Sequence, residues 1–141
     1  MAMARIVAGY TIEHEELVKM LKAQGWGPEP GEPELSVKEA MMTFISWRCA
    51  QPEPEDITKA LPRPQYWYDK DDNEILAFMT RYSGEKANWR TLRYREMPKD
   101  REIRDRFIAQ TGNVLDAKKM RFWSSPETYL HLPLGTKLFL D

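Results

Sequence analysis

The ten prolines of this 141-residue chain limit where helices and strands can form. Seven of them fall within residues 25–34 and 51–65, and the others are Pro98, Pro126 and Pro133. Proline lacks a backbone N–H and fixes one backbone dihedral angle, so helices and central strands cannot run through the two rich stretches. We therefore expect residues 25–34 and 51–65 to be surface loops, apart from one helical turn near residues 56–61.

The intervals on either side of these loops carry helical signals. Residues 11–24 predict a first helix, with Thr11 as its N-cap and with His14 on an apolar stripe. Much further along, Pro98 suits the first position of another helix, and Gly112 suits its C-terminal cap.

The helix between the two loops has the clearest start. Ser36 and Glu39 form the sequence pattern of a capping box, which predicts a helix from there to about Arg48. Its apolar stripe consists of Val37, Ala40, Met41, Phe44 and Ile45, and Met42 and Cys49 widen it. So broad an apolar surface predicts a central helix with more than one neighbour, and a Cys49 thiol that is buried and structural.

Aromatic and β-branched residues predict the strands. We expect them at residues 5–10, 66–68, 74–82, 89–97, 119–123 and 136–140. The second, third and fourth of these would form two successive hairpins, that is, a meander.

This order of elements predicts a single α+β domain over residues 1–141, with an antiparallel, flat or curved sheet and helices packed mainly on one face. In the curved form, a pocket lies between sheet and helices. The expected core consists of Ile6, Val7, Leu17, Leu21, Met41, Phe44, Ile45, Leu76, Phe78, Leu92 and Phe107.

The turn between two of the strands has the carboxylate spacing of a calcium loop, with Asp69, Asp71 and Asn73 at alternate positions. Such a loop also needs glycine at its sixth position and glutamate at its twelfth, where this chain has Glu74 and Thr80. We therefore interpret residues 69–73 as a hairpin tip and expect no metal and no cofactor.

Arginines and aromatic residues alternate on and beside the predicted strands. Side chains two residues apart on a strand point from the same face, about 7 Å apart, so a pair of arginines there could grip an anion beside a stacking ring. The candidate ligand-binding residues are Trp67, Arg81, Trp89, Arg93 and Arg95. The alternative is the solvated face of an antiparallel sheet, with the arginines paired to nearby glutamates.

Charge and hydropathy exclude other classes. Residues 1–80 carry a net charge of −6, whereas residues 81–106 carry +4. The overall charge of −1 argues against general nucleic-acid binding. No apolar run reaches the roughly 20 residues of a membrane helix, and the N-terminus does not have the pattern of a signal peptide, so we expect a soluble, cytoplasmic protein.

Two function hypotheses remain open. The first is a binding module, in which the aromatic and arginine residues line a cleft for a small organic or anionic ligand or a partner protein, with the two proline-rich loops as its rim. The second is a small cofactor-free enzyme, such as an isomerase, cyclase or hydrolase, using His14 or His131 with Tyr82 or Tyr94 for acid–base chemistry. An exposed edge strand could also pair across the axis of a homodimer.

Overall fold

The computed structural model describes residues 3–68, 74–88, 91–92 and 94–126. In chain order its elements are β1 (Met3–Ala4), β2 (Ile6–Ile12), α1 (His14–Ala23), α2 (Val37–Ala50), the 3-10 turn η1 (Ile57–Lys59), β3 (Pro64–Tyr68), β4 (Glu74–Tyr82), β5 (Ala87–Asn88), α3 (Pro98–Gln110), the 3-10 turn η2 (Ala117–Lys119) and β6 (Phe122–Pro126).

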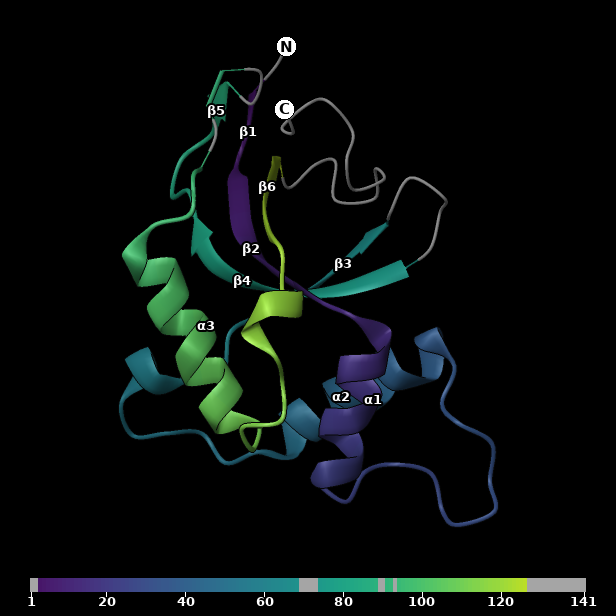
Figure 1. Cartoon of the computed structure of the whole chain (residues 1–141). Coiled ribbons are helices and arrows are strands. Elements are labelled where there is room, and N and C mark those ends of the chain that lie inside the picture. The colour runs from purple at the N-terminus through teal and green to yellow at the C-terminus, as the bar shows by residue number, and fades with distance from the viewer. Residues whose placement is uncertain (1–2, 69–73, 89–90, 93, 127–141) are drawn as a thin grey trace.

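An antiparallel sheet with helices on one side forms the architecture (Figure 1). Four strands pair in the order β3-β4-β2-β6, and every pair is antiparallel. The short strands β1 and β5 form a separate two-stranded ribbon. The predicted α+β class, with an antiparallel sheet and helices packed against it, is confirmed.

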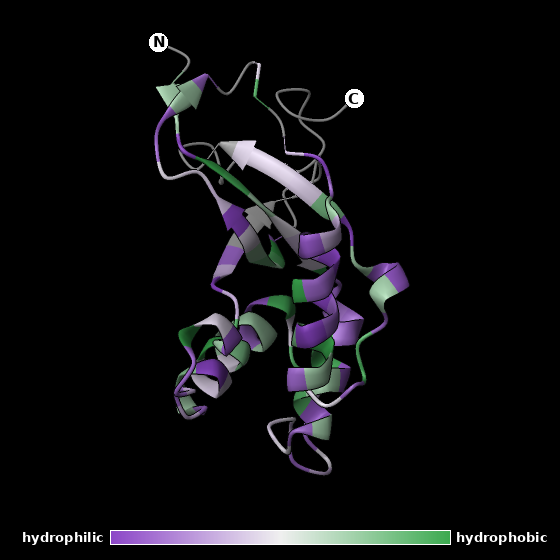
Figure 2. Cartoon of the chain, turned by 90° about the vertical axis from the view of Figure 1, so that its left-hand side faces the viewer, coloured by the Kyte–Doolittle hydropathy of each residue, from purple (hydrophilic) through white to green (hydrophobic). Residues whose placement is uncertain are grey.

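The core fills the space between the sheet and the three helices. Tyr10 of β2 and Phe78 of β4 are fully buried there, and the Phe78 ring stacks on Phe107 of α3 with 4.3 Å between ring centroids. Figure 2 shows the helices below the sheet, with hydrophobic residues coloured green in both layers. Most of the expected core is buried, whereas Ile45 and Leu92 are half-buried.

A bulge interrupts the pairing of β2 with β4. Ala8 faces Arg81 and Gly9 faces Met79, so Thr80 is an extra residue on β4. Only glycine fits opposite this bulge, because a Cβ on Gly9 would lie 1.9 Å from the Phe78 carbonyl oxygen.

Sequence signals at the helix ends correctly predicted the start of α2 and both ends of α3. The Ser36 hydroxyl accepts a hydrogen bond from the Glu39 amide at 3.2 Å, and the Glu39 carboxylate accepts one from the Ser36 amide at 3.0 Å. Pro98 is the first residue of α3, and Gly112, just beyond its end, has the positive φ of +97° that glycine adopts easily. The N-cap of the first helix was predicted wrongly, since Thr11 belongs to β2 and Glu13 is the N-cap of α1.

The predicted meander is wrong after its first hairpin. β3 and β2 occupy the two edges of β4, so no further strand can pair with β4. The chain instead pairs β5 with β1, and residues 91–92 and 94–97 lead to α3 without forming a strand. The strand predicted at 119–123 begins later, at Phe122, because Asp116 caps the turn η2 over residues 117–119. The predicted hairpin tip at 69–73 and the strand at 136–140 lie outside the described residues.

The broad apolar stripe of α2 was also interpreted wrongly. The buried residues of this helix are Ala40, Met41, Phe44 and Trp47. Met42 is 60% exposed and Cys49 is exposed, so neither packs in the core and the thiol is not a buried structural group. One face of α2 is therefore core, and Met42 and Cys49 face outward with Ile45, which is half-buried and packs against the edge of the core, between them.

Candidate functional site

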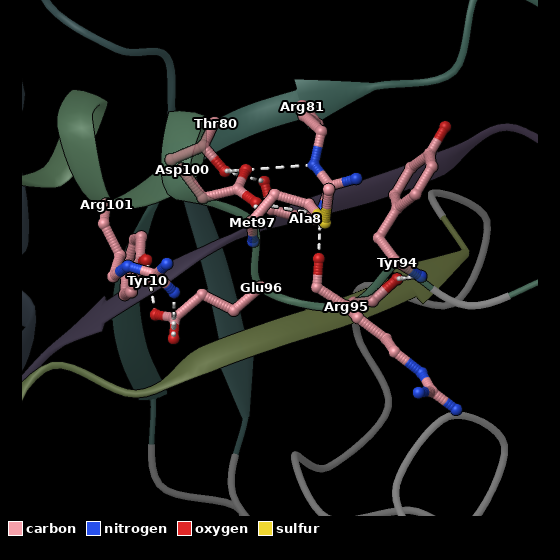
Figure 3. A network of polar contacts seen from close by, with 11 residues as sticks. Ala8, Tyr10, Thr80, Arg81, Tyr94, Arg95, Glu96, Met97, Asp100 and Arg101 are labelled. Atoms are coloured by element: carbon pink, nitrogen blue, oxygen red, sulfur yellow. Dashed lines mark hydrogen bonds and ion pairs between the residues drawn. The ribbon is translucent and has the colours of Figure 1, made fainter.

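A buried carboxylate lies at the centre of the main polar network (Figure 3). Asp100 is the third residue of α3 and is fully buried. Its oxygens accept hydrogen bonds from the Met97 amide at 2.8 Å, the Thr80 hydroxyl at 2.7 Å and the Arg81 Nε at 2.9 Å. The Arg81 Nη2 lies 2.9 Å from its second oxygen, so the arginine holds the carboxylate with two nitrogens.

The β4 bulge brings two consecutive residues to one carboxylate. Successive side chains of a regular strand point to opposite faces, but an extra residue re-aims the side chains around it. Thr80 and Arg81 can therefore both reach Asp100 of α3. The network thereby fastens the start of α3 to the sheet.

Arg81 is surrounded by partners from the chain itself. Its guanidinium carbon lies 4.5 Å from the centre of the Tyr94 ring, a cation–π distance, and its Nη2 donates to the Arg95 carbonyl oxygen. With Asp100 on its other side, this guanidinium is already neutralised and hydrogen-bonded. The arrangement acts as an internal clamp, because its charges are satisfied without a ligand.

A second polar contact lies beside the clamp, on Tyr10. The buried Tyr10 hydroxyl donates a hydrogen bond of 2.5 Å to Glu96, which also accepts one from Arg101 at 3.4 Å. Burial, followed by the neighbouring Glu96 carboxylate, raises the pKa of Tyr10 well above its usual value. Tyr10 therefore remains a proton donor and is unsuited to act as a base.

Three of the candidate residues come together here. Arg81, Tyr94 and Arg95 are neighbours, but the Arg95 side chain is exposed and points away from the clamp in Figure 3. Tyr82 lies near the end of β4 and accepts a hydrogen bond from Arg5 at 3.2 Å. Trp89, Arg93 and His131 lie outside the described residues; Trp67 belongs to β3, but its side chain is not among those described.

His14 does not join this network. It is the half-buried first residue of α1, and its Nδ1 atom has no hydrogen-bond partner among the described residues. The clamp lies beside Ala8, and Ile12, at the end of β2, is four residue steps further along the strand, a span of about 13 Å. A general base needs to lie within hydrogen-bond reach of its partner, so the described fold does not pair His14 with Arg81 or Asp100.

The second proline-rich stretch contacts the fold at two places. Its end runs beside β4, where the Met79 amide donates to the Arg63 carbonyl oxygen at 2.9 Å, two residues before Arg81. Loop 51–56 follows α2, and the chain then meets the far end of α3, where Gln110 donates to the Lys59 carbonyl oxygen at 2.7 Å. Asp100 lies ten residues earlier on the same helix, or about 15 Å along it. The contact of η1 with α3 and the Arg81–Asp100 clamp are therefore two separate regions of the described fold.

Another region, which we call the acidic α2 surface, consists of the outward strip of α2 and the acidic residues of the two loops. Exposed Met42, half-buried Ile45 and exposed Cys49 form the strip, at spacings of three and four residues. Exposed carboxylates lie in the loops before and after the helix (Figure 1) and in its first turn. They are Glu29, Glu32, Glu34, Glu39, Glu53, Glu55 and Asp56.

Three carboxylates of this surface have hydrogen-bond or ion-pair partners within the chain. Hydrogen bonds from Ser36 lower the pKa of Glu39, and hydrogen bonds from Thr58 lower the pKa of Asp56. Glu34 pairs with Lys22 of α1 at 2.5 Å. On the other side, Arg48 donates to the Pro62 and Leu61 carbonyl oxygens, at 3.1 and 3.2 Å. Both loops are therefore tied to the helical layer.

The spacing of residues in α2 could have predicted this surface. Residues 38, 42, 45 and 49 are spaced four, three and four apart, which places them on one stripe of a helix. The signal was missed because Met42 and Cys49 adjoin the core stripe, and a continuous apolar band does not show where burial ends.

Comparison with known proteins does not assign this chain to a family. None of the protein-family models, curated proteins or solved structures compared with the chain matches it. Within the described ranges, no three His, Cys, Asp or Glu residues are grouped so that they could hold a metal ion. No helix in the same ranges has the length and apolar character needed to cross a membrane.

Proposed function

We propose that this chain is a binding module for a partner protein and that the acidic α2 surface is its contact surface. The observation that carries the proposal is the exposure of Met42, 60% accessible on a helix whose opposite face holds four core residues. Exposed apolar side chains in a cluster, rimmed by polar residues, are typical of protein interaction sites.

The charge around the strip indicates a basic partner. Residues 26–56 contain seven acidic residues and two basic ones, a net charge of −5. One of the two basic residues, Arg48, is engaged with backbone carbonyl groups, and one of the seven acidic residues, Glu34, is paired with Lys22, so the excess of negative charge remains. Complementary charge speeds the encounter of two proteins and disfavours wrong partners.

The loops on either side suit such a surface. Proline restricts the backbone before binding as well as after it, so an ordered proline-rich loop loses less conformational entropy in a complex. Methionine is flexible and polarisable, and it adapts well to an apolar partner surface. The strip and its rim thus combine an adaptable centre with a restricted, charged edge.

The test compares two variants that each place a glutamate at an exposed methionine. Met42→Glu lies within the acidic α2 surface, whereas Met3→Glu, at a position 45% exposed, lies on β1 at the other end of the molecule (Figure 1). Immobilised wild-type protein and both variants are used to capture partners from a lysate of the source cells, and a captured protein is then purified. We expect a basic protein that the wild type and Met3→Glu retain and that Met42→Glu binds at least about tenfold more weakly.

Unchanged binding by Met42→Glu would contradict the proposal. If Met42→Glu, shown to be folded by circular dichroism, binds every purified partner as tightly as the wild type does, the acidic α2 surface is not the contact surface.

A further inference from the structure

We infer that the element received by the acidic α2 surface is a basic amphipathic helix of a different protein, lying alongside α2. This inference rests on the proposed function and adds the shape, charge and origin of the partner. Three features of α2 lead to it: the spacing of the strip, the charges at both helix ends, and the effect of those charges on a second copy.

The spacing of the strip matches helix-on-helix packing. Met42, Ile45 and Cys49 repeat the alternation of three and four residues that forms the seam between two helices packed at a shallow angle. From Met42 to Cys49 is two turns, about 10.5 Å, so a partner helix can place successive apolar residues against the strip.

An extended partner fits this surface poorly. A β-strand binds chiefly by adding main-chain hydrogen bonds to the edge of a sheet. The backbone groups within α2 are bonded along the helix itself, so this surface attracts a partner through side chains alone. Alternating side chains of a strand would not follow a strip with spacings of three and four.

The charges define the polar positions of the partner helix. Glu34 and Glu39 lie at the start of α2, and Glu53, Glu55 and Asp56 follow its end, all of them exposed. Lysine or arginine residues flanking the apolar stripe of the partner would face these carboxylates.

One residue gives the complex a direction. Lys38 is exposed and lies one turn before Met42 on the same stripe. A partner residue meeting Lys38 would be acidic or neutral, whereas all the charged residues from Ala50 to Asp56, beyond the opposite end of the strip, are acidic. This difference between the two ends favours one orientation of the partner helix.

A second copy of this chain is a poor occupant. In an antiparallel two-fold pairing of α2 helices, Glu34 and Glu39 of one copy would approach Glu53 and Glu55 of the other. In a parallel pairing, Glu39 would face its own equivalent. Like charges meet in both arrangements, which weakens association.

The experiment measures the binding of three fluorescent peptides of about 18 residues, long enough for roughly five helical turns. The first peptide has leucines at the seam positions of a heptad repeat, flanked by lysine and arginine. The second keeps the leucines and replaces the basic residues with glutamate. The third has the composition of the first but places its leucines at alternate positions, so that they cannot form one helical stripe.

Four forms of the full chain are titrated against each peptide by fluorescence anisotropy: the wild type, Met42→Glu, the double variant Glu53→Lys/Glu55→Lys, and the control Met3→Glu. We expect the wild type and Met3→Glu to bind the first peptide equally. Met42→Glu and the double variant should bind it at least about tenfold more weakly, as should the wild type with the second or third peptide.

The outcomes separate this inference from the function on which it rests. Equal binding of the first and third peptides would overturn the helical partner, and equal binding of the first and second would overturn the basic one. Either result leaves the proposed function in place if Met42→Glu still weakens binding. Binding of the first peptide that is unaffected by Met42→Glu, or no binding at all, overturns the inference. The proposed function is then tested separately, by comparing how tightly the wild type and Met42→Glu bind the purified natural partner. Dimerisation that sedimentation detects in the wild type but not in Met42→Glu would show that the occupant is a second copy.

Discussion

Gly9 faces the bulge of β4, where the two strands approach too closely for any other side chain. A Cβ at this position would lie 1.9 Å from the Phe78 carbonyl oxygen, and backbone atoms cannot turn aside as a side chain can. We predict that Gly9→Ala lowers the free energy of unfolding by about 3 kcal/mol or prevents folding. Urea denaturation followed by circular dichroism measures the change.

The control is Gly84→Ala. A Cβ at Gly84 meets nothing within 4 Å, and this exposed position needs no positive φ. Its effect should stay within about 0.5 kcal/mol. Similar losses in both variants would contradict the tight approach of β2 and β4.

Tyr10 predicts how stability depends on alkaline pH. The unfolded chain loses its tyrosine proton near pH 10, whereas burial and Glu96 raise the pKa of Tyr10 in the folded protein. Above pH 10 the folded state therefore holds more protons than the unfolded state, and the free energy of unfolding falls as pH rises. The contribution is complete below pH 10 and decreases by up to about 1.4 kcal/mol per pH unit above it.

Tyr10→Phe isolates this contribution. The variant loses about 1 kcal/mol at neutral pH with the hydrogen bond to Glu96, but its stability should fall less steeply between pH 10 and 11. Identical slopes in Tyr10→Phe and the wild type, measured by urea denaturation across this range, would count against the buried donor.

At the scale of the elements, the clamp fixes α3 to the sheet. Arg81→Met would leave the fully buried Asp100 carboxylate without its charge partner, and we predict a loss of about 3 kcal/mol in the free energy of unfolding. Asp100→Asn in the same chain removes the stranded charge, keeps one oxygen to accept from the Met97 amide and places an NH2 group that can donate to the Thr80 hydroxyl, so the double variant should recover most of the loss. A loss below about 1 kcal/mol in Arg81→Met would mean that the clamp does not hold α3.

The elements that sequence predicts well are those with local signals. The Ser36–Glu39 capping box and Pro98 act within one helical turn, so they could be interpreted without the rest of the fold. The Arg81–Asp100 contact could not, because it depends on a bulge created by the pairing of β4 with β2. The alternation of Arg93 and Arg95 suggested a strand, yet residues 94–97 form none, since neither edge of β4 is available to them.

The candidate site was predictable only in part. Arg81 and Arg95 were candidate binding residues and Tyr94 was a candidate of the enzyme hypothesis, but no local pattern predicts that Arg81 contacts a carboxylate 19 residues away. The outward strip of α2 has a clear spacing, but apolar residues surround most of this helix. Their burial depends on where α1, α3 and the sheet contact α2, and the sequence of α2 alone does not specify those contacts.

At the scale of the whole molecule, the fold separates two kinds of polar surface. One kind connects the sheet to α3 and to the residues just before it, through the Arg81–Asp100 and Tyr10–Glu96 contacts. The acidic residues of 26–56 lie in the first turn of α2 and in the loops before and after this helix. The clamp accounts for how the layers stay together, and the acidic α2 surface is the region that we propose for binding.

The most direct measurement of this proposal observes the methionine methyl groups by NMR while the basic amphipathic peptide is added. The chain has eight methionines, and Met42, Met3 and Met97 are exposed at separate places. We predict that the Met42 methyl signal shifts and saturates as the peptide is added, while those of Met3 and Met97 stay in place. A peptide that binds and shifts the Met3 or Met97 signal, but leaves Met42 unchanged, would contradict the proposal.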